Sequence, residues 1–185
     1  KYWIWYAVAA AAAIYTHYYL LFTIAAQGLF ILLYVIKRRN FKILWRALGS
    51  YLLVLILYLP WAKTFLEQVG RVQESYWIPP MNAWSVPGSI WKMVFGGQGI
   101  RNSVLLVTTL VTAMLIYYFI GRVKGFHKWH ILFALVIPFV AAVGLSFRTN
   151  LYLDRYFVFA SLYFVILITV IILELRLKYL WVILL

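Results

Sequence analysis

The chain has 185 residues, of which 66% are hydrophobic and 11% are charged. Soluble domains carry about 25% charged residues, so this composition excludes a soluble globule with a polar surface and predicts a membrane protein. The net charge of +13 does not indicate nucleic acid as a partner, because the basic residues stand in short blocks between apolar runs, as membrane orientation signals do. The absence of cysteine excludes disulfides.

Both ends of the sequence indicate a piece of a longer protein. The chain begins with Lys1, runs directly into the apolar residues 2–14, and closes within the apolar run 180–185. A bilayer span requires roughly 20 mostly apolar residues, so both runs are expected to be parts of longer helices. We therefore expect an internal or C-terminal portion of a larger protein. Five consecutive alanines, residues 9–13, predict close packing of the first run against another helix.

Five complete spans are predicted between these ends. They cover residues 20–36, 47–59, 103–120, 131–147 and 156–173. Trp45 and Trp61 bracket the second span, and such aromatic residues settle at the headgroup level. Pro138 lies inside the fourth, where it removes one ladder hydrogen bond and predicts a kink. The expected fold class is all-α: a polytopic transmembrane helix bundle, here a partial transmembrane domain over residues 1–185.

Residues 61–102 form the one long loop, and they differ in composition from the rest of the chain. They carry acids, isolated bases, prolines and glycines. Within the loop, Phe65, Val69, Val72 and Tyr76 recur at helical spacing, which predicts an amphipathic helix over 65–76 that lies along the membrane surface. Residues 89–95 predict a second short surface helix. We therefore expect an extracytoplasmic loop that contains short amphipathic helices.

The distribution of basic residues predicts the orientation. One face receives eleven bases, namely Lys1, Lys37, Arg38, Arg39, Lys42, Arg46, Arg122, Lys124, Lys128, Arg176 and Lys178. The other face receives six, spread over far more loop. The positive-inside rule makes the eleven-base face cytoplasmic. His17, the long loop and the pair Asp154-Arg155 are then extracytoplasmic, in a multi-pass protein of the cell membrane.

Two ionisable residues at the predicted outer boundary are candidate ligands for an anion. His17 stands among tyrosines at a helix end, and its charge changes near neutral pH. Arg155 stands at the mouth of the last complete span, where a guanidinium can bind two phosphate oxygens together. The alternatives are an interfacial histidine with a structural hydrogen bond, and an arginine that pairs with Asp154 or anchors the helix at the interface.

The other polar residues favour structural roles. Arg71 and Glu74 are spaced as a surface ion pair, and nothing places Glu67 and Glu74 across a substrate as a catalytic pair. His127 and His130 lack the further ligands of a metal site, so no metal site is predicted.

Three short motifs resemble the C-terminal portion of integral membrane glycosyltransferases of the GT-C type. The motifs are Tyr15-Thr16-His17-Tyr18-Tyr19, then Leu59-Pro60-Trp61 followed by Gln68 and Tyr76-Trp77-Ile78, and Asp154-Arg155-Tyr156-Phe157. They are similar to those of bacterial members of glycosyltransferase family 39, the relatives of dolichyl-phosphate-mannose protein mannosyltransferases and of the lipid A aminoarabinose transferase. The resemblance covers most of the chain in layout and these motifs in identity.

This resemblance implies transfer of a sugar from a polyprenyl-phosphate donor to an acceptor on the extracytoplasmic side, with inversion at the anomeric carbon. The acceptor is a protein, a lipid or a glycan, and the need for a divalent metal stays open. An aspartate in the family's first external loop serves as the base. That loop is expected upstream of Lys1, so the catalytic residue is not identified and the fragment alone is expected to be inactive.

The resemblance also assigns candidate site residues. The donor phosphate is expected at Arg155, His17 and Tyr156, and the substrate loop is expected to use Tyr15, Gln68, Arg71 and Trp77. Two other functions remain open. The chain could belong to a transporter or lipid flippase, although its complete spans hold no charge and only one proline. It could also belong to a non-catalytic assembly subunit, which would tolerate replacement of Arg155.

Overall fold

The computed structural model describes residues 1–74, 78–97, 100–148, 150 and 152–175, with the backbone alone for 72–74. Regular structure in these residues is entirely helical, which confirms the all-α fold class. The helices are α1 (Tyr2–Thr16), α2 (Leu20–Arg38), α3 (Phe41–Tyr58), α4 (Ala62–Glu74), α5 (Ser85–Phe95), α6 (Asn102–Arg122), α7 (Lys128–Ser146) and α8 (Val158–Glu174). Two short 3₁₀ helices, η1 (Leu59–Trp61) and η2 (Asp154–Phe157), precede α4 and α8.

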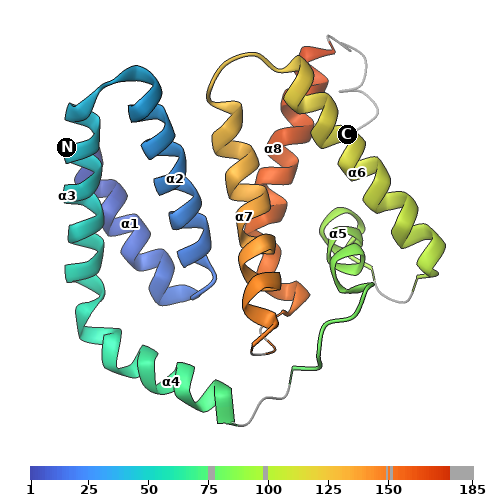
Figure 1. Cartoon of the computed structure of the whole chain (residues 1–185), viewed down its shortest axis with the longest axis horizontal. Coiled ribbons are helices and arrows are strands. Elements are labelled where there is room, and N and C mark those ends of the chain that lie inside the picture. The colour runs from blue at the N-terminus through green and yellow to red at the C-terminus, as the bar shows by residue number, and fades with distance from the viewer. Residues whose placement is uncertain (75–77, 98–99, 149, 151, 176–185) are drawn as a thin grey trace.

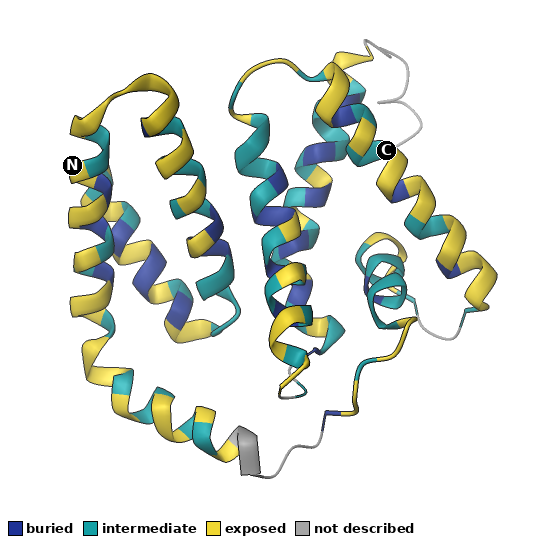
Figure 2. Cartoon of the chain, in the orientation of Figure 1, coloured by how far each residue is buried: buried dark blue, intermediate teal, exposed yellow. Residues whose placement is uncertain are grey.

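Five helical segments in the described residues are long and apolar enough to cross a membrane. They are Leu20–Arg38, Phe41–Arg71, Asn102–Arg122, Lys128–Ser146 and Asp154–Glu174. Only 17–28% of their most apolar windows is buried inside the chain, and large apolar side chains line their outer faces (Figure 2). Apolar surface on this scale requires lipid as the solvent. The chain is therefore a multi-pass membrane protein.

Several helix boundaries differ from the predictions, and prolines and basic residues explain the differences. The second span starts at Phe41 rather than 47, because basic residues can extend a helix beyond its apolar part. It also continues through Pro60 into α4, since a 3₁₀ turn accommodates the proline. The helix α5 starts at Ser85, before the predicted residue 89. Pro87 lies in its first turn, where backbone N–H groups have no acceptor within the helix, so a proline costs no hydrogen bond there. Pro138 lies inside α7, which continues to Ser146.

The helices stand in two groups, α1–α3 and α5–α8, which meet where α2 packs against α7 (Figure 1). In the first group α1 packs on α3, and Ala7, Ala10 and Ala11 are buried in a cluster that includes Val54 of α3. In the second group Phe119 of α6 and Leu167 of α8 are fully buried. Small side chains let helix backbones approach closely in a membrane, which explains why α1 fits between its neighbours.

One end of the bundle gathers the segments that the sequence predicts to be extracytoplasmic. The α1–α2 corner, α4, the start of α6 and the η2 turn lie at the lower end in Figure 1, whereas the connections 39–40 and 123–127 lie at the opposite end. Ring contacts between His17 and Tyr156 join the first and last of these segments directly. Residues almost 140 positions apart in the chain thus meet at one end of the bundle.

Candidate functional site

His17 occupies a tight corner between α1 and α2. It ends α1 with an extended backbone conformation (φ −159°, ψ 122°), and its N–H donates to the carbonyl of Ala13 at 3.0 Å. Two residues later the N–H of Tyr19 donates to His17 Nδ1 at 3.2 Å. This local bond fixes the orientation of the imidazole, because the ring nitrogen and the amide belong to the same turn.

The η2 turn carries Arg155 and Tyr156. Asp154 Oδ1 accepts a hydrogen bond from the backbone N–H of Arg155 at 2.9 Å, and the N–H of Tyr156 donates to the carbonyl of Leu153 at 3.0 Å. Phe157 anchors the turn, since it is buried and stacks on Phe139 with ring centres 4.2 Å apart and planes 5° apart. The anchored turn leaves Arg155 exposed at the end of the bundle.

The three predicted phosphate-binding residues come together at this end. The ring of His17 lies 5.0 Å from that of Tyr156 and 5.4 Å from that of Phe159, and Tyr19 lies 4.7 Å from Tyr156. The Arg155 guanidinium lies over the Tyr156 ring, 5.5 Å from its centre. The arrangement presents an imidazole and a guanidinium on a floor of aromatic rings. Such a surface suits an anion that also carries an apolar or sugar group.

The electrostatics of the cluster favour the neutral form of His17. Partial burial, and secondly the nearby positive charge of Arg155, lower the pKa of His17 below its ordinary value. A neutral imidazole whose Nδ1 accepts a hydrogen bond carries its proton on Nε2. His17 can therefore donate from Nε2–H to a ligand.

An apolar groove leads from this cluster toward the middle of the bundle. It has a volume of about 470 Å³ and lies between α1, α2 and α8. Ala9, Ala10 and Ala13 form its α1 wall, and Val158, Phe159 and Leu162 form its α8 wall. Phe159 belongs to both the groove and the His17 cluster. The groove thus begins beside the polar cluster, and Phe159 is the residue that the two share.

The predicted substrate-loop residues do not join the cluster as a group. The Tyr15 hydroxyl donates to the carbonyl of Leu57 at 3.0 Å, so this residue ties α1 to α3. Gln68 Oε1 accepts a hydrogen bond from the Tyr18 hydroxyl, which itself accepts one from Trp61 Nε1 at 3.0 Å. Tyr18 thereby fastens α4 next to the corner that holds His17. Apart from its place in the Tyr15–Tyr19 motif, nothing in the sequence predicted that Tyr18 would connect α4 to this corner.

The remaining loop residues have simpler positions. Arg71 is exposed near the end of α4, and Trp77 lies outside the described residues. The side chain of Glu74 also lies outside them, so the predicted pair with Arg71 stays a prediction. Glu67 instead approaches Lys63 at 3.9 Å on the exposed face of α4.

One charged contact near the site was missed. Asp154, which the sequence suggested as a partner for Arg155, forms an ion pair with Lys92 of α5. The two residues are 62 positions apart, so no helical or strand periodicity could have linked them.

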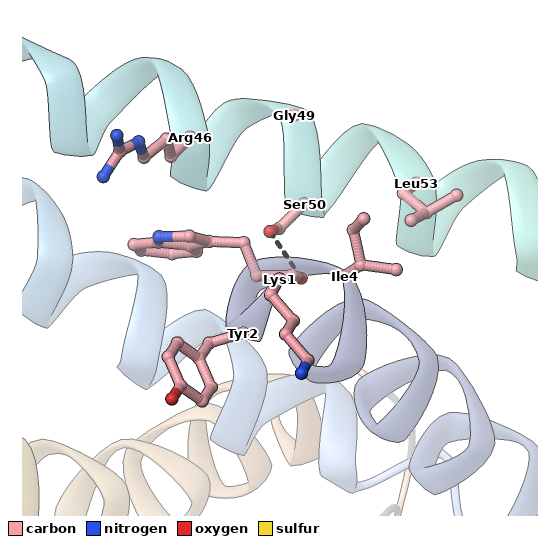
Figure 3. Close-up of a pocket in the computed structure, with 8 residues that line it drawn as sticks. Lys1, Tyr2, Ile4, Arg46, Gly49, Ser50 and Leu53 are labelled. Carbon is pink, nitrogen blue, oxygen red and sulfur yellow. Dashed lines mark hydrogen bonds between the residues drawn. The ribbon is translucent and has the colours of Figure 1, made fainter.

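Two other features of the described residues lie apart from the cluster. A cavity of about 480 Å³ near the start of α1 is lined by residues that include Lys1, Arg46 and Ser50, and Ser50 Oγ donates to the Trp3 carbonyl at 2.9 Å (Figure 3). It lies at the opposite end of α1 from His17. No three histidine, cysteine or acidic side chains in the described part of the chain meet as metal ligands do.

Comparisons with protein-family models, with curated proteins and with solved structures give no match to this chain.

Proposed function

We propose that the protein transfers a sugar from a polyprenyl-phosphate donor to an acceptor at the extracytoplasmic membrane boundary. The observation that carries the proposal is that a polar cluster and an apolar groove meet at Phe159. An imidazole and a guanidinium, His17 and Arg155, lie at one end of the bundle, and an apolar groove between α1 and α8 begins at Phe159, which contacts His17. A polyprenyl phosphate needs this combination, because its phosphate stays at the headgroup plane while its chain stays in hydrocarbon.

The cluster would act on the leaving group. In an inverting transfer, the acceptor oxygen attacks the anomeric carbon from one side while the bond from that carbon to the phosphate oxygen breaks on the other. The electron pair of the broken bond leaves with the polyprenyl phosphate, which gains negative charge. Arg155 and the Nε2–H of His17 would stabilise that charge. The base that takes the acceptor proton is expected in the preceding external loop that the family resemblance implies.

The experiment that tests the proposed function supplies the intact protein, in nanodiscs, with a panel of sugars linked to polyprenyl phosphate. We expect acceptor-dependent release of polyprenyl phosphate and a glycoside of opposite anomeric configuration. Movement of the donor lipid between leaflets without cleavage would contradict the proposal and support a flippase. Transfer from a soluble nucleotide sugar in place of the lipid donor would also contradict it.

The extracytoplasmic placement of the cluster leads to a labelling prediction. Residues 1–185 lack cysteine, so with any cysteine elsewhere in the protein replaced, a single introduced cysteine reports on its own position. Lys63 on α4 lies at the cluster end and Lys124 lies in the connection at the opposite end, and both are exposed. We expect an impermeant thiol reagent added to intact cells to label Lys63→Cys, and Lys124→Cys only after permeabilisation. The reverse pattern would place the cluster in the cytoplasm.

The lowered pKa of His17 predicts a pH dependence of donor binding. A bound phosphodiester favours the imidazolium, so binding raises the His17 pKa and takes up a proton. Affinity should therefore increase as the pH falls from about 8 to about 5. The donor itself, a phosphodiester, does not titrate in this range. Binding measured across it should lose this dependence in His17→Gln, and an identical profile in the variant would exclude His17 as the titrating group.

A further inference from the structure

The loop helix α5 is attached to the η2 turn by contacts that the proposed function does not use. Lys92 Nζ donates to Asp154 Oδ2, and the two side chains are 38% and 26% exposed. Partial shielding from solvent makes this ion pair stronger than an exposed pair of the same geometry. It places a lysine of the extramembrane loop next to the turn that carries Arg155.

A second, uncharged contact holds α5 in the same place. The buried Tyr152 hydroxyl donates to Ser89 Oγ at 2.8 Å, and Ser89 Oγ donates to the carbonyl of Ser85 at 3.1 Å. Burial raises the pKa of Tyr152 to about 12, so its hydroxyl stays protonated and remains a donor. The Tyr152 ring also lies 4.9 Å from that of Phe157. The attachment of α5 therefore does not depend on the ion pair alone.

The ion pair with Lys92 compensates the negative charge that Asp154 places next to Arg155. The Asp154 carboxylate is attached to the residue next to Arg155, and without a partner it would repel an anionic ligand and attract the guanidinium. In the structure one carboxylate oxygen accepts from Lys92 and the other from the Arg155 backbone N–H. Both oxygens are thus engaged by donors that keep the η2 turn in its observed conformation.

We propose that Lys92 is a positioning residue that neutralises Asp154 and so maintains the anion-binding capacity of the His17–Arg155 cluster. The proposal rests on the proposed function, since it assumes that the cluster binds the donor phosphate. It also links the extramembrane loop to the phosphate site, because α5 supplies the compensating charge. A displacement of α5 would unmask Asp154 and weaken donor binding.

The test measures binding of a polyprenyl phosphate to the intact protein in nanodiscs. We expect Lys92→Met to raise Kd about tenfold, because it leaves an uncompensated carboxylate beside the bound anion. Lys92→Arg should retain binding. The double variant Lys92→Met with Asp154→Asn should restore wild-type affinity, since both charges are then absent. Lys63→Met, which removes the exposed ion pair with Glu67, is the matched control and should change nothing.

The double variant distinguishes two roles for Lys92: compensating the charge of Asp154, or only holding α5 in place. If Lys92 only holds α5 in place, removing Asp154 as well cannot restore binding, and that result would overturn the proposal. If Lys92→Met fails to fold, Asp154→Asn alone tests the proposal. This variant keeps Lys92 and removes a negative charge, so its binding of polyprenyl phosphate must equal or exceed that of the wild type. Weaker binding by this variant would overturn the proposal.

Binding by a further variant, Arg155→Ala, distinguishes failure of this inference from failure of the proposed function. Arg155→Ala should weaken polyprenyl phosphate binding whether or not Lys92 has the role proposed here. Unchanged binding in Arg155→Ala would mean that the cluster is not the phosphate site, and the proposed function would fail. Weakened binding in Arg155→Ala with wild-type binding in Lys92→Met would leave the function in place and remove only the role of Lys92.

Discussion

Replacing Arg155 with alanine in the intact protein is expected to lower the turnover of the proposed sugar transfer by about 10²–10³, the loss typical when one donor to a developing oxyanion is removed. The guanidinium lies over Tyr156 next to His17, where charge on the departing phosphate would develop. Arg155→Lys should recover only part of the activity, because an ammonium cannot bind two phosphate oxygens as a planar fork does.

The control for this prediction is Arg148→Ala. Arg148 is an exposed arginine just beyond the C-terminal end of α7, at the same end of the bundle, and its N–H donates to the carbonyl of Leu145. Its removal changes the net charge by the same amount as Arg155→Ala and should leave turnover within a factor of about two, since exposed charges are screened by salt. His17→Ala should fall between the two arginine variants. Wild-type turnover in both His17→Ala and Arg155→Ala would remove the site assignment.

The second large effect is expected from filling the groove. Ala13 lines it on the α1 side, one turn before His17. Ala13→Phe should raise the KM for a long-chain polyprenyl donor by about 10- to 100-fold, because each methylene kept out of the apolar groove forfeits about 0.8 kcal/mol of burial. A water-soluble donor with one or two isoprene units should retain most of its turnover, since its phosphate still reaches Arg155.

Ala12→Phe is the matched control for the groove. Ala12 is the neighbour of Ala13 in the same helix, is exposed, and is not among the residues that line the groove. The same added volume there should leave donor KM unchanged. Equal losses in Ala12→Phe and Ala13→Phe, or equal losses with short and long donors, would mean that the substitutions disturb α1 rather than block a chain.

The fold was predictable to the extent that it depends on hydropathy. Apolar runs of near-bilayer length identify spans whatever their neighbours are, and all five predicted spans are present as helices. Their boundaries were less predictable. Phe41 to Arg46 is helical although it carries Lys42 and Arg46, and Ser85 to Gly88 is helical although it contains Pro87 and Gly88. Backbone hydrogen bonding continues a helix past the point where hydropathy stops indicating one.

The members of the candidate site were partly predictable. His17 and Arg155 were predicted from their positions at span ends and from the motifs that contain them, and the alternation of spans places both at one end. Lys92 and Ser89 were not identified. Their partners, Asp154 and Tyr152, belong to a segment more than 60 residues away. Nothing in the sequence of a loop helix such as α5 indicates which distant segment it packs against.

By itself the sequence determined that the chain is helical, that it crosses a membrane several times, and which segments share each side, because desolvation of the backbone and the count of basic residues act locally along the chain. Only the tertiary structure decided that the His17 and Tyr156 rings touch, that a groove lies between α1 and α8, and that Lys92 takes the Asp154 carboxylate. These contacts depend on how helices rotate and approach one another, and packing between distant segments sets those quantities.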